Sequence, residues 1–336
     1  MVRSPDFDIQ RSSLRDSALA PATLRTYTIN LQSFLQFTQL TMSSFISIPA
    51  AAVDHRLAEY IEHLHSLGRP FDYASHTVNG VVFRRPELRL QLGESRLRLR
   101  GWQRTRRTQS HPPLTWELAV VFAVTMSKSG HHAAAVALLL AFDCYLRVGE
   151  LVRLQRADVI LPHDARTGRS HTGMALRLAV TKTGLNQWVS IQDSAVGELL
   201  ESWIRRTASG ARPHDPVFPF SAAHFRRLLR STAEAAGVGH IPYVPHSLRH
   251  GGATADFLTG ATIEQVMFRG RWQSMQSARR YIQSGRALLA AQQVPSHVNR
   301  LGILLDDDLM AVMGYLMDSV PLVLPSRRRV RFAQAS

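Results

Sequence analysis

The chain has 336 residues, of which 40 are Lys or Arg and 25 are Asp or Glu, so its formal net charge is +15 with every His neutral. This excess favours a polyanionic partner. The 45% of hydrophobic residues supply enough apolar material for folded cores, which excludes a largely disordered basic tail. The single cysteine, Cys144, excludes an intrachain disulfide and gives no sign of an oxidising compartment.

Two features of the sequence predict an intracellular protein. The longest strongly apolar run, residues 133–142, is about half as long as a bilayer-spanning helix and is expected to be a core helix. The charged start of the chain has no apolar stretch behind it, so no secretory signal is expected there.

Apolar residues recur at spacings of three and four in the first hundred residues. They predict helices over residues 22–38 and 53–64, and a third over about 75–85, before Pro86. A run with a single acidic residue follows within 94–107, and its arginines are Arg96, Arg98, Arg100, Arg104, Arg106 and Arg107. We interpret this run as a basic helix or arm on nucleic acid, the alternative being a solvated helix face.

The sequence beyond Pro112-Pro113 has a mixed pattern. Helical patterns occur at about 115–127, 131–146, 194–206, 220–236 and 246–259, with short ones through Tyr281. Between them, alternating residues over 174–191 predict a β-hairpin. One more amphipathic helix is expected over 304–317, before a basic end at 327–331 that is either a nuclear signal or a DNA-binding tail. The predicted class is therefore mainly α with a small antiparallel sheet.

Several enzyme classes find no support in the spacing of the residues. The phosphate-binding loop of nucleotide hydrolases, the glycine motif of dinucleotide-binding folds and the nucleophile elbow of serine hydrolases are all missing from the sequence. A metal site is not favoured, because His246 and His250 share a helix face but no glutamate follows the first of them.

Lysine is nearly absent, since only Lys128 and Lys182 occur among the 40 basic residues. An ammonium group can give up a proton and a guanidinium cannot, so a proton-donating role requires lysine. Lys182 lies beside the predicted hairpin turn, where a loop can reach a substrate, whereas Lys128 is typical of a charge at a helix end.

Two further clusters carry side chains suited to an anion. His246 and Arg249 are three residues apart at the start of a predicted helix and therefore share a face. Trp272 offers an indole N–H nine residues before Tyr281. Each residue alone has a simpler structural explanation. In their order and spacing, however, segments 141–151, 180–184, 246–250 and 270–272, with residue 281, resemble the tyrosine recombinase (phage integrase) family.

The resemblance covers about residues 114–290 and implies a set of catalytic roles. Tyr281 matches the nucleophile that forms a 3′-phosphotyrosyl link and releases a 5′-hydroxyl. Arg147 and Arg249 match the arginines that clamp the phosphate oxygens. Lys182 matches the hairpin lysine that protonates the leaving 5′-oxygen. His246 matches the histidine that helps accept the tyrosine proton.

Other positions follow from the same resemblance. Trp272 stands where most members have histidine, and its indole N–H can donate a hydrogen bond but cannot transfer a proton. Glu150 and His250 are expected to orient Arg147 or the catalytic histidine. The helix before the His-x-x-Arg box supplies three candidates for DNA contact, Arg226, Arg227 and Arg230, although a solvated basic face is an equal alternative.

The implied organisation is a two-domain DNA clamp. It comprises an all-helical core-binding domain over 1–110, a catalytic domain over 111–297, and a tail over 298–336 whose helix packs either in trans between protomers or in cis. The implied partner is a double-stranded recombination site, bound by a dimer and brought together in a tetramer, with no metal or other cofactor. We expect a DNA-associated protein, in a nucleoid or a nucleus, that acts in integration or excision of a mobile element. The alternatives are a catalytically idle DNA-organising relative and an enzyme resembling type IB topoisomerases or resolvases.

Overall fold

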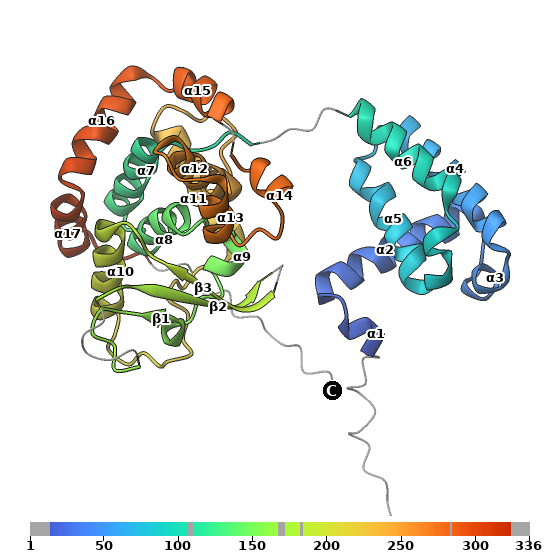
Figure 1. The fold of residues 1–336 in the computed structure, drawn as a ribbon, viewed down its shortest axis with the longest axis horizontal. Helices are drawn as coiled ribbons and strands as arrows, with labels where there is room; N and C mark the ends of the chain where they lie inside the picture. The colour runs from blue at the N-terminus through green and yellow to red at the C-terminus, as the bar shows by residue number, and fades with distance from the viewer. Residues whose placement is uncertain (1–13, 107–110, 167–171, 182–183, 283, 324–336) are drawn as a thin grey trace, which may run out of the picture. The chain divides into compact units, whose positions relative to one another are not determined.

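The computed structural model describes residues 14–106, 111–166, 172–181, 184–282 and 284–323. Three features expected from the sequence, Lys182, Arg107 and the basic end at 327–331, lie outside these residues. The chain divides into two compact units, Met1–Gln109 and Ser110–Ser336, and each is described by itself (Figure 1).

The first unit is entirely helical over its described residues. Its elements are α1 (Leu14–Ser17), α2 (Pro21–Thr38), α3 (Met42–Ser47), α4 (Ala50–Ser66), α5 (Phe71–Arg84), the 3₁₀ helix η2 (Pro86–Leu90) and α6 (Gly93–Thr105). The apolar stripes predicted from spacing meet in one core, in which α2 packs on α5 and α4 packs on α6. The three predicted helices are therefore confirmed, and the arginine-rich run forms helix α6 as far as Thr105.

A buried carboxylate fixes the start of α6. Asp54 of α4 accepts hydrogen bonds from the backbone N–H groups of Glu94 and Ser95, both at 2.9 Å, and from the Ser95 hydroxyl at 2.6 Å. A negative charge at a helix N-terminus satisfies N–H groups that have no partner within the helix. The arginines of α6 are consequently carried on a helix of fixed position within the unit.

The second unit surrounds a fully buried helix with helices and a small sheet. Its elements are α7 (Trp116–Lys128), α8 (His132–Asp143), α9 (Val148–Leu151), η3 (Arg156–Asp158), β1 (Val159–Ile160), β2 (Ala175–Thr181), β3 (Gly184–Ser190), α10 (Ser194–Arg206), α11 (Ala222–Ala235), α12 (Pro245–Leu258), α13 (Ile263–Arg269), α14 (Met275–Arg279), α15 (Ser284–Gln293), α16 (Ser296–Asp307) and α17 (Leu309–Ser319). Every residue of α8 is buried, which confirms the predicted core helix. Figure 1 shows the sheet at one edge of this helical unit.

The sheet contains the predicted hairpin. Strands β2 and β3 pair antiparallel with Arg177 opposite Trp188, and β1 adds a short third strand through Val159 opposite Leu176. Leu176 and Leu178 are buried while Ala179 is exposed, as expected for alternation on a half-buried sheet. The predicted fold class, mainly α with a small antiparallel sheet, is confirmed.

Helix α12 approaches its neighbours at backbone distance because two glycines lie in its buried face. A Cβ atom at Gly251 would stand 2.1 Å from the carbonyl oxygen of Leu114, and one at Gly252 would stand 2.1 Å from that of Phe142. A real Cβ atom does not come so close, so no other residue fits without a shift of the backbone. This close contact sets the distance between α12 and the end of α8.

The C-terminal region corrects one prediction from the sequence. The single helix expected over 304–317 is wrong, because the chain bends at Asp308 and forms two helices, α16 and α17. After the bend, Leu309 and Met313 of α17 are buried in the core of the second unit. Both helices pack within their own chain, α16 on α7 and α17 on α7 and α10. The expected boundary at 297/298 falls inside α16.

In the parts of the chain that the structure describes, no helix combines the length and the apolar character needed to cross a bilayer.

Candidate active site

The second unit brings the described members of the predicted catalytic set together. Arg147 follows the turn after α8, and His246 and Arg249 lie on the first turns of α12. Trp272 lies between α13 and α14, and Tyr281 follows α14. The guanidinium carbon of Arg249 stands 4.5 Å from the ring centre of Trp272 and 5.1 Å from that of Tyr281. Lys182, in the predicted hairpin turn, is outside the described residues.

The ring of Tyr281 is surrounded by three other rings. Its centre lies 4.8 Å from His250, 4.6 Å from Trp272 and 5.2 Å from His246. Its backbone carbonyl accepts a hydrogen bond from the Thr254 hydroxyl at 3.2 Å and lies 3.2 Å from Nδ1 of His250. Both partners belong to α12, so that helix holds the tyrosine against the histidines and the arginine of the same chain.

Arg249 is fully buried, with 0% of its surface exposed. It donates to the backbone carbonyls of Tyr145 and, at 2.5 Å, Gly270, while its Nε has no acceptor among the described residues. Burial, with the nearby charges of Arg147 and Arg271, lowers the pKa of Arg249 to about 9. A buried cation next to other cations is stabilised by an anion, so the site favours a negatively charged ligand.

One carboxylate serves two further arginines. Glu150, which is 3% exposed, accepts from Nη1 of Arg147 at 2.7 Å and from Nη2 of Arg271 at 3.0 Å. It also accepts from the backbone N–H of Arg147 at 2.9 Å. Burial raises the pKa of Glu150, but the charge of Arg271 and the hydrogen bonds from Arg147 outweigh it, and the net pKa is lowered. Two guanidinium groups therefore share one ionised carboxylate, whose charge also acts on Arg249.

His246 is a base in this environment. Burial lowers its pKa to about 4, and the charges of His250, Arg249, Arg147 and His111 act in the same direction. The imidazole is consequently neutral at pH 7 and has a nitrogen lone pair available for a proton.

Trp272 carries a buried donor without an acceptor. The residue is 7% exposed, and its Nε1 has no hydrogen-bond partner among the described residues. An unsatisfied buried N–H group costs about 1–3 kcal/mol. Such a group is retained where a ligand supplies the acceptor, and here it lies beside the Arg249 guanidinium.

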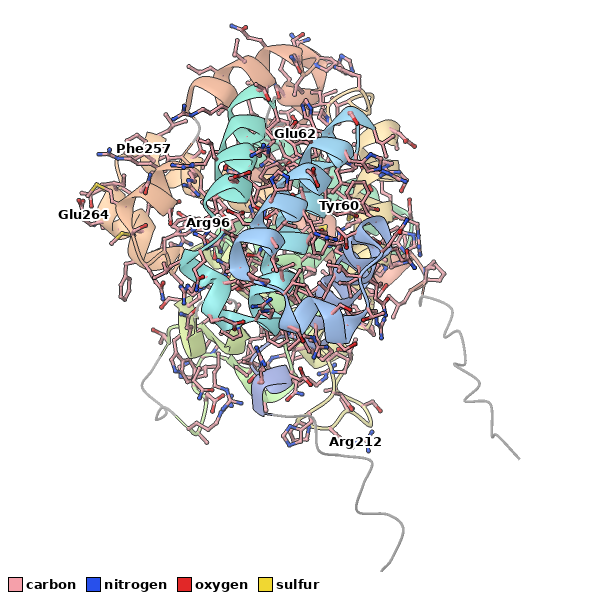
Figure 2. All side chains as sticks on the ribbon, turned by 90° about the vertical axis from the view of Figure 1, so that its right-hand side faces the viewer. Tyr60, Glu62, Arg96, Arg212, Phe257 and Glu264 are labelled. Atoms are coloured by element: carbon pink, nitrogen blue, oxygen red, sulfur yellow. The ribbon has the colours of Figure 1, made fainter. Side chains whose placement is uncertain are left out.

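The candidate DNA-binding arginines of α6, with Arg106 directly after it, divide into two groups. Arg98 pairs with Glu62 at 3.3 Å and Glu94 at 3.4 Å, and Arg106 lies 3.9 Å from Asp72. Three others form no ion pair with the described residues and are exposed, namely Arg96, Arg100 and Arg104. Figure 2 labels Arg96 on α6 and Glu62 on the neighbouring α4. The three candidates on α11 are also exposed and form no ion pair in the described part of the chain, namely Arg226, Arg227 and Arg230.

Sequence patterns missed two residues at the centre of the site. Arg271 is 5% exposed at its side chain and shares Glu150 with Arg147. It lies between Gly270 and Trp272, which belong to a segment that resembles the family, and this position is its only signal in the sequence. Tyr145 supplies the carbonyl that accepts from Arg249, and its position two residues before Arg147 was the only available signal. Both adopt left-handed backbone, with φ of 56° and 48°, which side-chain spacing does not reveal.

Across the described residues, no group of three or more His, Cys, Asp or Glu side chains is arranged to hold a metal ion.

The comparisons with known proteins identify a family. A model of the phage integrase family matches residues 119–287. No curated protein matches the chain significantly.

Solved structures share the fold at low sequence identity. A lambda integrase dimer bound to a COC′ core site has a TM-score of 0.56 and 15% identity, over 81% of this chain and 74% of that chain. XerH site-specific recombinase bound to a palindromic difH substrate, in a post-cleavage complex, has a TM-score of 0.51 and 14% identity, over 80% and 78%. The Tn1549 transposon integrase with transposon right end DNA has a TM-score of 0.51 and 12% identity, over 80% and 99%.

The family match covers half of the chain and includes every described residue of the arginine, histidine, tryptophan and tyrosine cluster. The chain therefore belongs to the phage integrase family, the tyrosine recombinases.

Proposed function

We propose that the protein breaks and rejoins DNA at specific sites, and that Tyr281 is its nucleophile. The observation that carries this proposal is the place of the Tyr281 ring, 5.1 Å from the Arg249 guanidinium and 5.2 Å from the ring of His246. A phenol beside a fixed cation and a neutral base is suited to attack on a phosphodiester. The tyrosine oxygen would bond to phosphorus, the bond to the 5′-oxygen would break, and a 3′-phosphotyrosyl link would remain.

The phosphate would occupy the space that the buried donors face. Arg249 and Arg147 would clamp its non-bridging oxygens, since a planar guanidinium binds two oxygens at once. The Trp272 indole would donate to the same group. The bound phosphate would thereby supply the acceptor that Nε1 of Trp272 lacks among the described residues. Its negative charge would also compensate the excess positive charge that three arginines and one carboxylate leave.

Two protons would move in each cleavage. His246, neutral at pH 7, would accept the proton of the Tyr281 hydroxyl. Lys182, which lies outside the described residues, would protonate the leaving 5′-oxygen. Rejoining would reverse both transfers with the 5′-hydroxyl of another strand. Because the phosphotyrosyl bond keeps the energy of the bond it replaces, we propose that no metal or nucleotide cofactor is required.

DNA would be held by both units of the chain. The exposed arginines without ion pairs, on α6 and on α11, are suited to contacts with the phosphate backbone. The solved relatives include a lambda integrase dimer on its core site and XerH on its substrate. By analogy we propose a two-domain clamp, a dimer on each site, a tetramer in synapsis, and a DNA-associated role in integration or excision of a mobile element.

A nicked, end-labelled suicide substrate tests the proposal. DNA from the flanks of the protein's own gene is incubated with the wild type and with Tyr281→Phe, and label that remains on protein is sought on a denaturing gel. The wild type should form the adduct and the variant should not. Salt-sensitive binding without an adduct would favour the catalytically idle relative. With a supercoiled plasmid as a second substrate, relaxed circles without exchanged strands would favour the topoisomerase-like alternative.

A further inference from the structure

Tyr145 occupies a backbone conformation that is unusual for its residue type. Its φ is 48°, in the left-handed region, and its side chain is fully buried with 0% exposure. Residues with a Cβ atom are disfavoured in this region and persist there only when surrounding contacts hold them. The contacts of Tyr145 therefore indicate what its conformation serves.

The backbone carbonyl of Tyr145 holds arginines of the site. It accepts from Nη1 of Arg249 and, at 3.3 Å, from Nη2 of Arg271. The second Nη group of Arg249 donates to the carbonyl of Gly270 at 2.5 Å. Two main-chain oxygens thus fix the plane of the Arg249 guanidinium, and one of them belongs to the left-handed Tyr145.

The side chain of Tyr145 contacts two charged residues on two segments, and one of them is held by a third. Its hydroxyl donates to Asp256 of α12, and the Arg269 guanidinium lies 5.0 Å from its ring centre. Arg269, at the end of α13, also pairs with Asp256 and, at 2.5 Å, with Asp143 at the end of α8. We call Asp143, Tyr145, Asp256 and Arg269 the anchor cluster.

The anchor cluster is largely buried, and its one arginine is shared by two carboxylates. The side chains of Arg269 and Asp143 are 10% and 7% exposed, and that of Asp256 is 30% exposed. Burial raises the pKa of Tyr145, and the carboxylate of Asp256 acts in the same direction, so the phenol stays protonated as a donor. None of these contacts involves the space assigned to the phosphate, so the cluster acts on the site through Tyr145.

We propose that the anchor cluster is a positioning device for Arg249. The hydroxyl contact with Asp256 and the contact of Arg269 with the ring hold the Tyr145 carbonyl where Arg249 needs it to clamp the scissile phosphate. This inference rests on the proposed function of the site. A guanidinium held in place before substrate arrives needs no reorganisation during the reaction, and a misplacement of about 1 Å can cost about 10²-fold in rate.

Tyr145→Phe tests the role with the smallest change, since it removes the hydroxyl and keeps the ring. The readouts are the Kd for nicked DNA and the single-turnover rate of adduct formation at saturating DNA. We expect a Kd within about twofold of the wild type and a rate about 10- to 100-fold lower, by the loss of one buried contact to a charged partner. Asp256→Ala should lower the rate similarly, and the double variant should be no slower than the slower single variant.

Two control variants separate positioning from general loss of stability. Tyr243→Phe removes another buried phenol hydroxyl, one that has no partner among the described residues, and should leave the rate unchanged. Leu309→Ala in α17 removes core packing far along the chain and should lower Tm without lowering the rate measured well below Tm.

A positioning role also requires dependence on Arg249 itself. In an Arg249→Lys background, Tyr145→Phe should change the residual rate by less than about twofold, because the group it positions is gone. If Tyr145→Phe lowers the rate by the same factor in the Arg249→Lys background as in the wild type, the inference is overturned. A Tyr145→Phe rate equal to that of the wild type would also overturn it. No adduct with wild-type protein would overturn the proposed function and this inference together, whereas a normal adduct with Tyr145→Phe overturns the inference alone.

Discussion

The indole of Trp272 is a donor that lacks an acceptor in the described part of the chain. If Trp272 binds the phosphate, catalysis depends on its N–H group and not on the size of its ring. We expect Trp272→Phe to slow adduct formation by about 10- to 100-fold, as for loss of a hydrogen bond to a charged group. Trp272→His loses a similar volume but keeps an N–H group, so it should retain most of the rate. The measurement is the single-turnover cleavage rate of each variant, and the comparison requires that their Kd values for DNA are equal.

Equal rates for the two variants would contradict this account. They would show that the size of the Trp272 ring, which stacks on Tyr145 with centres 6.1 Å apart, matters more than its N–H group.

The lowered pKa of His246 predicts a pH dependence of stability. The unfolded chain binds a proton on this histidine near pH 6.5, and the folded chain binds it only near pH 4. Protonation therefore favours the unfolded state, so the stability of the folded state is full above about pH 6.5 and is lost as the pH falls toward 4. Between pH 7 and 4.5, the wild type should lose about 2 kcal/mol more than His246→Gln.

Urea denaturation of both proteins at the two pH values checks this expectation. Because the other ionisable groups are common to both proteins, the comparison isolates His246. A pH-independent difference between them would mean that the histidine is not desolvated beside Arg147 and Arg249.

The residues of the site were predictable where the chemistry itself restricts the residue type. Arg147, His246 and Arg249 carry spacings and side chains that few other roles require, and the structure brings them together with Trp272 and Tyr281. Tyr145 and Arg271 were not predictable. Their contribution depends on left-handed backbone and on contacts such as that from Tyr145 to Asp256, more than a hundred residues away.

At the scale of elements, the site depends on the close packing of α12 against the end of α8. An added methyl group at Gly252 meets a backbone oxygen of Phe142 and the ring of Tyr145. We expect Gly252→Ala to lower the free energy of unfolding by about 3 kcal/mol, because neither the backbone nor a buried ring yields cheaply. Thermal and urea unfolding measure this effect.

Gly314 in α17 provides the matched control. A Cβ atom there meets nothing within 4 Å, so Gly314→Ala should raise stability by about 0.5–1 kcal/mol through helix propensity alone. Equal effects of the two substitutions would contradict the close approach of α12.

Helix α6 carries a second prediction at this scale. The double variant Arg100→Gln/Arg104→Gln removes two exposed charges that form no ion pair with the described residues. If both contact phosphates, the slope of log K against log[salt] should become shallower by about 2, with Tm unchanged. Arg205→Gln on α10, which removes one exposed charge paired with Glu201, should leave the slope unchanged. An unaltered slope in the double variant would assign these arginines to a solvated face.

Elements were predictable where the apolar period was regular and uninterrupted. The stripes of α2 and α4, the apolar run of α8 and the alternation of the hairpin all identified their structures. The C-terminal helices were not separable from sequence, since the period continues through the acidic run 306–308 and the bend at Asp308 depends on how α17 meets α7 and α10.

At the scale of the whole chain, basic residues are distributed over two compact units. The net charge of +15 and the exposed arginines of both units fit a polyanionic partner. The family match and every described residue of the candidate site lie in the second unit. The sequence predicts a domain boundary where periodicity is lost before Pro112-Pro113, and each unit has an apolar core of its own.

The central claim is that Tyr281 forms a covalent bond to the 3′ side of a broken strand. The most direct test is mass spectrometry of the adduct from a suicide substrate after tryptic digestion. The account predicts a nucleotide on the peptide 281–286, attached through the tyrosine oxygen, and a 5′-hydroxyl on the released strand. A nucleotide on any other peptide, or a 5′-phosphate on the released strand, would contradict it.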